Sequence, residues 1–77
     1  MRVKVYLPSF GDRTVLDERN TLALPEGATL GDGLRKLRIP VLLRRLPIVV
    51  VNHKRAAPSQ VLCEGDTIAF VGYHVGG

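Results

Sequence analysis

The sequence predicts a single α+β domain, in which a mixed sheet of four to five strands packs one helix against one face. Three observations lead to this fold class. The 77 residues are enough for one domain with a modest core. Apolar and polar residues alternate near both ends of the chain, as in strands that bury one face. One stretch between these ends has leucines at helical spacing.

A hairpin with a long connection is predicted for the first part of the chain. Residues 2–7 alternate charged or polar side chains with apolar ones. A turn containing proline and glycine follows at residues 8–12. Residues 14–24 hold β-branched and apolar side chains around a polar interruption, and Leu22 and Leu24 are expected to face inward.

A short helix is predicted after Thr29. Thr29 and Asp32 match a capping box in which Asp replaces the usual Glu. Pro40 should end the helix, because proline disfavours helical angles in the residue before it. Gly31 and Gly33 weaken the first turn by about 1 kcal/mol each relative to alanine. The helix should therefore depend on packing one apolar face, which consists of Leu30, Leu34 and Leu37.

The second half of the chain predicts the remaining strands. Residues 48–51 are β-branched throughout, which indicates a strand covered on both faces. A turn or strand end is expected at 52–55 and a small bridge at 61–62. A tight turn at 64–66 leads into a last strand at 67–71.

The order of elements predicts how the sheet is assembled. Strand, strand, helix, strand, short strand and strand allow the last strand to pair in parallel beside the first, so that both are buried at the centre. This is the β-grasp, or ubiquitin-like, arrangement. Residues 41–46 fit either a helical turn or a loop. Residues 72–77 are expected to be a flexible tail of the single domain 1–77.

The charge distribution favours an anionic partner. The net charge is +4, and no acidic residue occurs between Leu34 and Arg55. The basic residues of this stretch are Arg35, Lys36, Arg38, Arg44, Arg45, Lys54 and Arg55. Nucleic acid, an acidic protein surface or a phosphate ligand would fit them, and so would a simply solvated basic face. No apolar run approaches the about 20 residues of a membrane span, and the start lacks a signal peptide's apolar block. We therefore expect a cytoplasmic protein with no membrane partner.

Metal and thiol chemistry are not expected. Cys63 is the single cysteine, so no internal disulfide can form. His53, Cys63 and His74 are too widely spaced for a metal-ligand pattern. Cys63 is expected to be a small, half-buried filler before a turn.

Four segments resemble the small sulfur-carrier proteins, a family that includes the molybdopterin synthase small subunit and the sulfur carrier of thiamine biosynthesis. Residues 24–32 resemble their turn and helix start, and residues 49–54 their valine-rich strand and Asn-Gly turn, with His53 where glycine is usual. Residues 64–70 resemble their Gly-Asp turn and final strand, and the pair at 76–77 resembles their Gly-Gly ending.

The resemblance leaves the pathway open. Residues 71–75 differ from the Pro-Pro-Val tail of the molybdopterin carriers and from the Gly-Gly-Gly-like ending of many thiamine carriers. The long connection between the first two strands is similar to the molybdopterin type. The short segment after the helix is similar to the thiamine type.

In this family the chemistry belongs to the terminal glycine, which corresponds to Gly77. The resemblance implies that a ubiquitin-activating-type adenylyltransferase uses ATP to adenylate the Gly77 carboxylate. Sulfur from a sulfurtransferase then replaces AMP, and the resulting thiocarboxylate donates sulfur to a synthase subunit. Gly76 gives the clearance to enter a narrow channel. The chain itself has no phosphate-binding loop and is expected to bind no cofactor. It is a carrier or protein cosubstrate, comparable with the non-catalytic small subunit of a synthase.

The partner should dock on the sheet face opposite the helix. Strand alternation places Tyr6, Val50, Ala69, Val71 and Tyr73 on that face, where an apolar patch would form a binding surface. We expect basic residues around the patch. A Val50→Asp change is expected to abolish activation without unfolding the domain.

Two other functions fit parts of the sequence. A ubiquitin-like modifier would share the same scaffold and conjugate its terminus to lysines. Residues 51–54 and 64–68 also resemble a small RNA-binding domain of a ribosomal small-subunit protein. That family opens with two basic helices, whereas this chain opens with strands, and no aromatic pair suits base stacking. Nucleic acid is therefore not the partner we expect.

Overall fold

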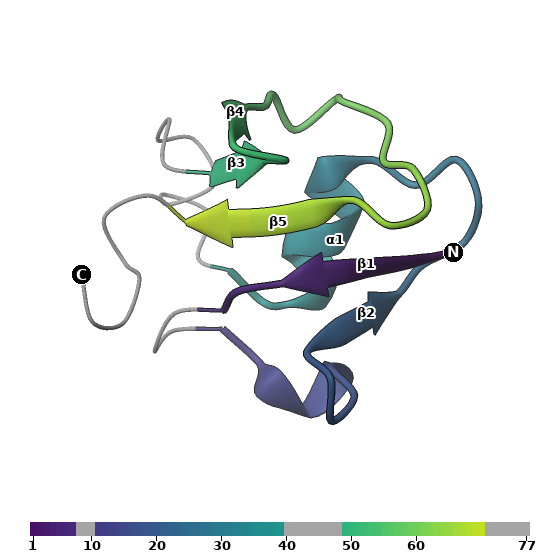
Figure 1. Cartoon of the computed structure of the whole chain (residues 1–77), viewed down its shortest axis with the longest axis vertical. Helices are drawn as coiled ribbons and strands as arrows, with labels where there is room; N and C mark the ends of the chain where they lie inside the picture. Colours follow the sequence, from purple (N-terminus) through teal and green to yellow (C-terminus); the bar gives the residue numbers. More distant parts are fainter. Residues whose placement is uncertain (8–10, 40–48, 71–77) are drawn as a thin grey trace.

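The chain folds into one mixed sheet with a helix on one face (Figure 1). The computed structural model describes residues 1–7, 11–39 and 49–70. The strands are β1 (Arg2–Val5), β2 (Thr21–Ala23), β3 (Val49–Val51), β4 (Lys54–Arg55) and β5 (Thr67–Phe70). The helices are the α-helix α1 (Leu30–Lys36) and the 3-10 helix η1 (Arg13–Val15).

The strand order is β2-β1-β5-β3-β4, which confirms the predicted β-grasp arrangement. β1 and β5 run parallel, and the other neighbouring strands are antiparallel. The last strand thus lies at the centre of the sheet. The predictions for residues 8–10 and 41–46 lie outside the described residues.

The first hairpin has the predicted long connection. Val3 of β1 lies opposite Leu22 of β2. Asp12 caps η1 by accepting a hydrogen bond from the Thr14 N–H. The polar interruption is a turn held by Asp17, whose carboxylate accepts hydrogen bonds from the backbone N–H groups of residues 19 and 21. Short polar side chains here form hydrogen bonds with nearby backbone groups in place of hydrogen bonds between strands. The predicted strand at residues 14–24 is interrupted for this reason.

The core lies between the sheet and α1. It contains the inward-facing residues that alternation and helical spacing predicted, and all three helix leucines are fully buried. Its largest fully buried side chains are Leu22, Leu30, Leu34, Leu37, Ile39, Ile68, Val3 and Val5. Few aromatic side chains take part, so small branched residues supply most of the packing.

The capping box at the start of α1 is confirmed. The Asp32 N–H donates to Thr29 Oγ1 (3.2 Å), and the Thr29 N–H donates to Asp32 Oδ2 (2.9 Å). The next free N–H groups, of Leu30 and Gly31, donate to backbone carbonyls of residues 60 and 58 (both 2.8 Å). A neighbouring loop therefore satisfies this helix end.

The helix ends in a Schellman motif, before the proline that was predicted to stop it. The Ile39 N–H donates to the Leu34 carbonyl, and the Arg38 N–H to the Arg35 carbonyl, both at 3.0 Å. Arg38 takes the left-handed conformation (φ 57°) that this motif requires. This backbone cap and the burial of Ile39 end the helix. Pro40, the cause predicted from the sequence, is therefore an incomplete explanation.

The loop between β3 and β4 keeps the tight geometry of an Asn-Gly turn. Val51 pairs with Lys54, and both intervening residues have positive φ, 53° at Asn52 and 70° at His53. Such a two-residue loop is a type I′ turn. The Asn52 side chain donates to Asp66 (2.9 Å) and accepts from the N–H of residue 67 (3.0 Å), which ties this turn to the start of β5.

Candidate functional site

The strand that leads toward Gly76 and Gly77 is paired with a neighbour on both sides. β5 pairs with β1 through Ile68 and with β3 through Phe70, and both side chains are buried. Residues 71–77 continue from its end. The predicted site residues Val71, Tyr73, Gly76 and Gly77 lie outside the described residues.

Three predicted partner-binding residues share the sheet face opposite α1. Tyr6 follows the buried Val5, and one step beyond the Val5–Ile68 pair it lies beside Ala69. Ala69 is paired in turn with Val50. The structure therefore brings Tyr6, Ala69 and Val50 into one row across β1, β5 and β3, which we call the outer row.

Burial within the outer row differs from the expected open apolar patch. Tyr6 is 55% exposed and Ala69 is half-buried, whereas Val50 is only 9% exposed. All of β3 is buried, as its β-branched sequence predicted. An aspartate at position 50 would place a carboxylate in a nearly dry site, which costs folding free energy. We therefore expect Val50→Asp to destabilise the domain as well as its docking, so this variant is a poor test of docking alone.

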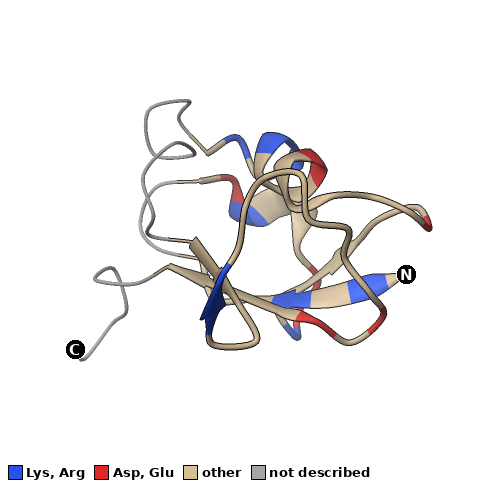
Figure 2. Cartoon of the chain, turned by 90° about the horizontal axis from the view of Figure 1, so that it is seen from above, with Lys and Arg blue, Asp and Glu red and all other residues tan. Residues whose placement is uncertain are grey.

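Cations flank the outer row. Lys4 Nζ lies 5.4 Å from the centre of the Tyr6 ring, a cation–π contact at one end. Arg55 of β4 is paired with Val50 at the other end. Figure 2 shows the basic residues of β1 and β4 in the sheet layer, apart from those of the helix. Strand alternation could have identified Lys4, because it shares the face of Tyr6.

The basic residues of this stretch that lie in the described ranges do not form one patch. At the helix end, Arg35 lies 3.6 Å from Asp32 and Arg38 lies 3.8 Å from Asp12. Lys36 donates to a backbone carbonyl of β2 (2.8 Å). The last two basic residues of the stretch belong instead to the sheet edge β4.

The aspartates of the described ranges act as local caps. Hydrogen bonds from Thr14 lower the pKa of Asp12, and one from the Thr21 N–H lowers the pKa of Asp17. Hydrogen bonds from Thr29 lower the pKa of Asp32. Each of these carboxylates is thus stabilised as an anion, which does not suit the role of a general acid at neutral pH.

Cys63 lies at the turn before β5. Cys63 is exposed, so the expectation that it would be half-buried is wrong. Its backbone N–H and carbonyl are both hydrogen-bonded to Asp66 at the turn before β5, where Gly65 has a φ of 84°.

Within residues 1–7, 11–39 and 49–70, no group of three His, Cys, Asp or Glu residues could hold a metal ion. No helix in these ranges is long and apolar enough to cross a membrane.

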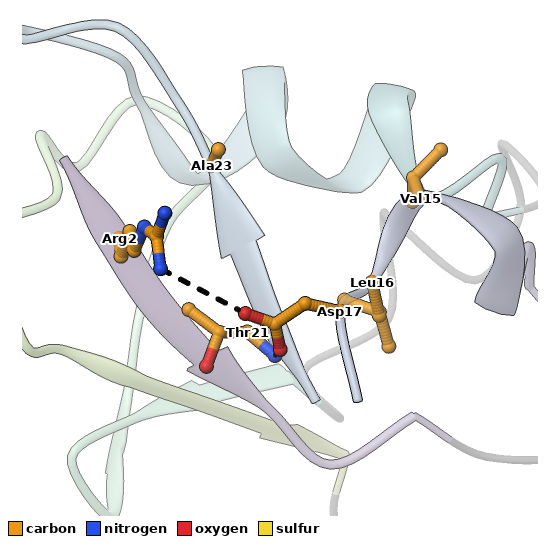
Figure 3. Close-up of a pocket in the computed structure, with 6 residues that line it drawn as sticks. All are labelled: Arg2, Val15, Leu16, Asp17, Thr21 and Ala23. Atoms are coloured by element: carbon orange, nitrogen blue, oxygen red, sulfur yellow. Dashed lines mark hydrogen bonds and ion pairs between the residues drawn. The ribbon is translucent and has the colours of Figure 1, made fainter. Parts of the chain in front are cut away.

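A pocket of about 260 Å³ lies beside β2 (Figure 3). Its lining consists of Arg2, Val15, Leu16, Asp17, Thr21 and Ala23. The Arg2 guanidinium points toward the Asp17 carboxylate, at 3.9 Å. That carboxylate also holds the adjacent turn. The two charged groups of the pocket thus already interact with each other, and the carboxylate also accepts hydrogen bonds that hold the turn.

Comparisons with protein-family models, with curated proteins and with solved structures found no match to this chain.

Proposed function

We propose that this domain is a sulfur carrier whose Gly77 carboxylate is adenylated and then converted to a thiocarboxylate. One observation carries the proposal: β5 is the central strand of a β-grasp sheet, and the chain continues from it to Gly76 and Gly77. A central strand that is paired on both sides is a suitable base for a terminal segment that must enter another protein's site. The seven residues after Phe70 would span about 23 Å when extended.

The carrier's own part in the chemistry is small. The Gly77 carboxylate attacks the α-phosphate of ATP in a partner's site, and pyrophosphate leaves. A sulfide nucleophile from a sulfurtransferase then attacks the acyl carbon, AMP leaves, and a thiocarboxylate remains. The folded domain contributes positioning, because docking holds the terminal carboxylate near the reacting phosphate. The thiocarboxylate would then serve molybdopterin or thiamine biosynthesis through a synthase subunit.

The outer row supports the docking step of this proposal. It presents the exposed ring of Tyr6, just after β1, and the half-buried Ala69, near the end of β5. Tyr6→Ala replaces Val50→Asp as the test substitution, because an exposed ring can be removed at little cost to the core. Adenylation by the ubiquitin-activating-type enzyme should weaken in this variant, while thermal stability stays close to that of the parent protein.

Intact-mass spectrometry tests the proposal directly. The purified protein, whose mass first establishes that Gly77 is the last residue, is incubated with ATP, a sulfide source and the adenylating enzyme of the same organism. Replacement of oxygen by sulfur adds about 16 Da. Deletion of Gly77 should abolish this gain. Conjugation of the chain to lysines of other proteins, with no gain of sulfur, would instead identify a ubiquitin-like modifier.

A further inference from the structure

The first hairpin and its connection border a pocket that the proposed function does not use. The pocket lies beside the edge strand β2 and has a volume of about 260 Å³ (Figure 3). This volume is below the roughly 300–1,000 Å³ of pockets that hold drug-sized molecules. The pocket therefore has room for a small metabolite and not for a nucleotide-sized cofactor.

Much of the pocket lining is apolar. Val15 and Leu16 are half-buried and pack against the core with part of their surface, so the remainder is open to the pocket. Ala23 is exposed on β2, and Thr21 lies two residues before it, on the same face of the strand. Such walls favour an aliphatic group of a ligand, because contact removes apolar surface of both partners from water.

The described residues that line the pocket also include one charge of each sign, Arg2 and Asp17. The Arg2 Nη1 atom lies 3.9 Å from Asp17 Oδ2, a distance that makes an ion pair but is too long for a hydrogen bond. The two side chains are 71% and 40% exposed, so this pair contributes little to folding. Both groups therefore keep hydrogen-bonding capacity that a ligand can use.

The anionic side of the pocket is already ordered. Asp17 Oδ1 accepts hydrogen bonds from the backbone N–H groups of Arg19 (2.8 Å) and Thr21 (2.9 Å). The Asp17 N–H donates in turn to the Thr21 carbonyl (3.1 Å). These bonds hold the carboxylate in place while Oδ2 faces Arg2. A ligand thus meets a fixed acceptor, which lowers the entropic cost of binding.

We propose that this pocket binds a free α-amino acid with a branched aliphatic side chain, such as L-leucine. The ligand carboxylate accepts hydrogen bonds from the Arg2 guanidinium, its ammonium donates to Asp17 Oδ2, and its side chain lies against Val15. A molecule with only one of the two charges leaves the other protein group without a partner, and such sites discriminate against it. The proposal does not rest on the function proposed above, because it involves neither the terminal glycines nor the outer row.

Amide NMR with four matched ligands tests the proposal on the intact chain. L-Leucine should shift the amides of residues 2, 15–17, 21 and 23, with a dissociation constant below about 10 mM. N-acetyl-L-leucine lacks the ammonium, L-leucinamide lacks the carboxylate and glycine lacks the side chain, so each should bind at least about fivefold more weakly. Shifts centred elsewhere, a dissociation constant above that limit, or equal binding of any of the three would overturn the proposal. Equal binding of N-acetyl-L-leucine would indicate the carboxyl end of a peptide as the ligand instead.

Two substitutions locate the site. Ala23→Phe fills the pocket from an exposed position and should abolish the shifts. Ala57→Phe, the same change at an exposed site in the loop after β4, is the matched control and should leave the dissociation constant within about twofold. Equal effects of these two variants would refute the assignment of the pocket.

Removal of the cation gives a second, independent measurement. Arg2→Gln should bind L-leucine no more tightly than the parent protein binds L-leucinamide, because the same ion pair is missing in both complexes. Thermal unfolding establishes that each variant is folded. Since the Arg2 side chain is largely exposed, this variant decides the question even where Ala23→Phe does not fold. Undiminished binding of L-leucine by Arg2→Gln would contradict the role given to the guanidinium.

Discussion

Replacing Gly33 by alanine should stabilise the domain, although Gly33 is buried beneath the sheet. A Cβ built at this position meets Leu24, Ile68 and Leu22 at 3.6, 3.7 and 3.8 Å. These are ordinary van der Waals distances, so the methyl group fits without displacing its neighbours. Helix propensity contributes about 1 kcal/mol and burial of the methyl group up to about 0.8 kcal/mol. The expected gain is therefore about 1–2 kcal/mol.

Gly31 provides a matched control on the same helix. A Cβ there would lie 3.2 Å from the Pro58 carbonyl oxygen, which accepts the hydrogen bond of the Gly31 N–H (2.8 Å). Because the contact is with backbone, the loop must move away from the helix start, and a bond that satisfies an N-terminal N–H group weakens. Gly31→Ala should therefore be neutral or destabilising by about 1 kcal/mol.

Thermal unfolding followed by circular dichroism measures both variants. For a domain of this size, 1 kcal/mol shifts the midpoint by about 4–8 °C. Gly33→Ala should raise the midpoint by roughly 5–10 °C, and Gly31→Ala should not raise it. The reasoning fails if Gly33→Ala lowers the midpoint, or if the two variants rise equally, since propensity alone would then explain both.

Three more predictions concern the turns and the helix start. His53→Gly should raise the free energy of unfolding by about 0.5–1 kcal/mol in urea, because glycine adopts the positive φ of the type I′ turn without strain; His53→Ala should give no gain. Arg38→Gly should give a similar gain at the Schellman position, since the ion pair it loses is exposed; a loss above about 0.5 kcal/mol would show that the Asp12 contact dominates. Hydrogen bonds from Thr29 hold the pKa of Asp32 below its ordinary 3.8. They therefore contribute fully to the free energy of unfolding above pH 3.8, and this contribution is lost as the pH falls through the lower pKa of the folded state. Stability measured from pH 2 to 6 should therefore decline less steeply on acidification in Asp32→Asn, and an unchanged slope would contradict this account.

Local sequence signals predicted most of the fold because each depends on a short-range physical cause. Alternation in residues 2–7 identified β1 and its inward face, since successive strand side chains point in opposite directions. Thr29 and Asp32 located the start of α1, since the capping box closes within four residues. The end of α1 was harder to predict, because arginine is an uncommon residue at a left-handed position.

The candidate site was predicted less completely than the fold. Alternation assigned Tyr6, Val50 and Ala69 to the outer face correctly, but it contains no information on how deeply each side chain is covered. Val50 is nearly buried although it faces away from the helix. The basic stretch likewise favoured an anionic partner, and the structure divides its described residues between the helix end and β4.

By itself, the sequence determined the order of elements and the residues of the core, and it contains the Gly76-Gly77 pair that motivates the proposed chemistry. These follow from periodicity, capping and composition, which act within a few residues. Only the tertiary structure decided which cations are neutralised and which remain available. Lys4 and Arg55 are far apart in the sequence, and the pairing of β1 with β5, β5 with β3 and β3 with β4 places them on one face. Ion pairing depends on distance in space, and strand pairing sets that distance.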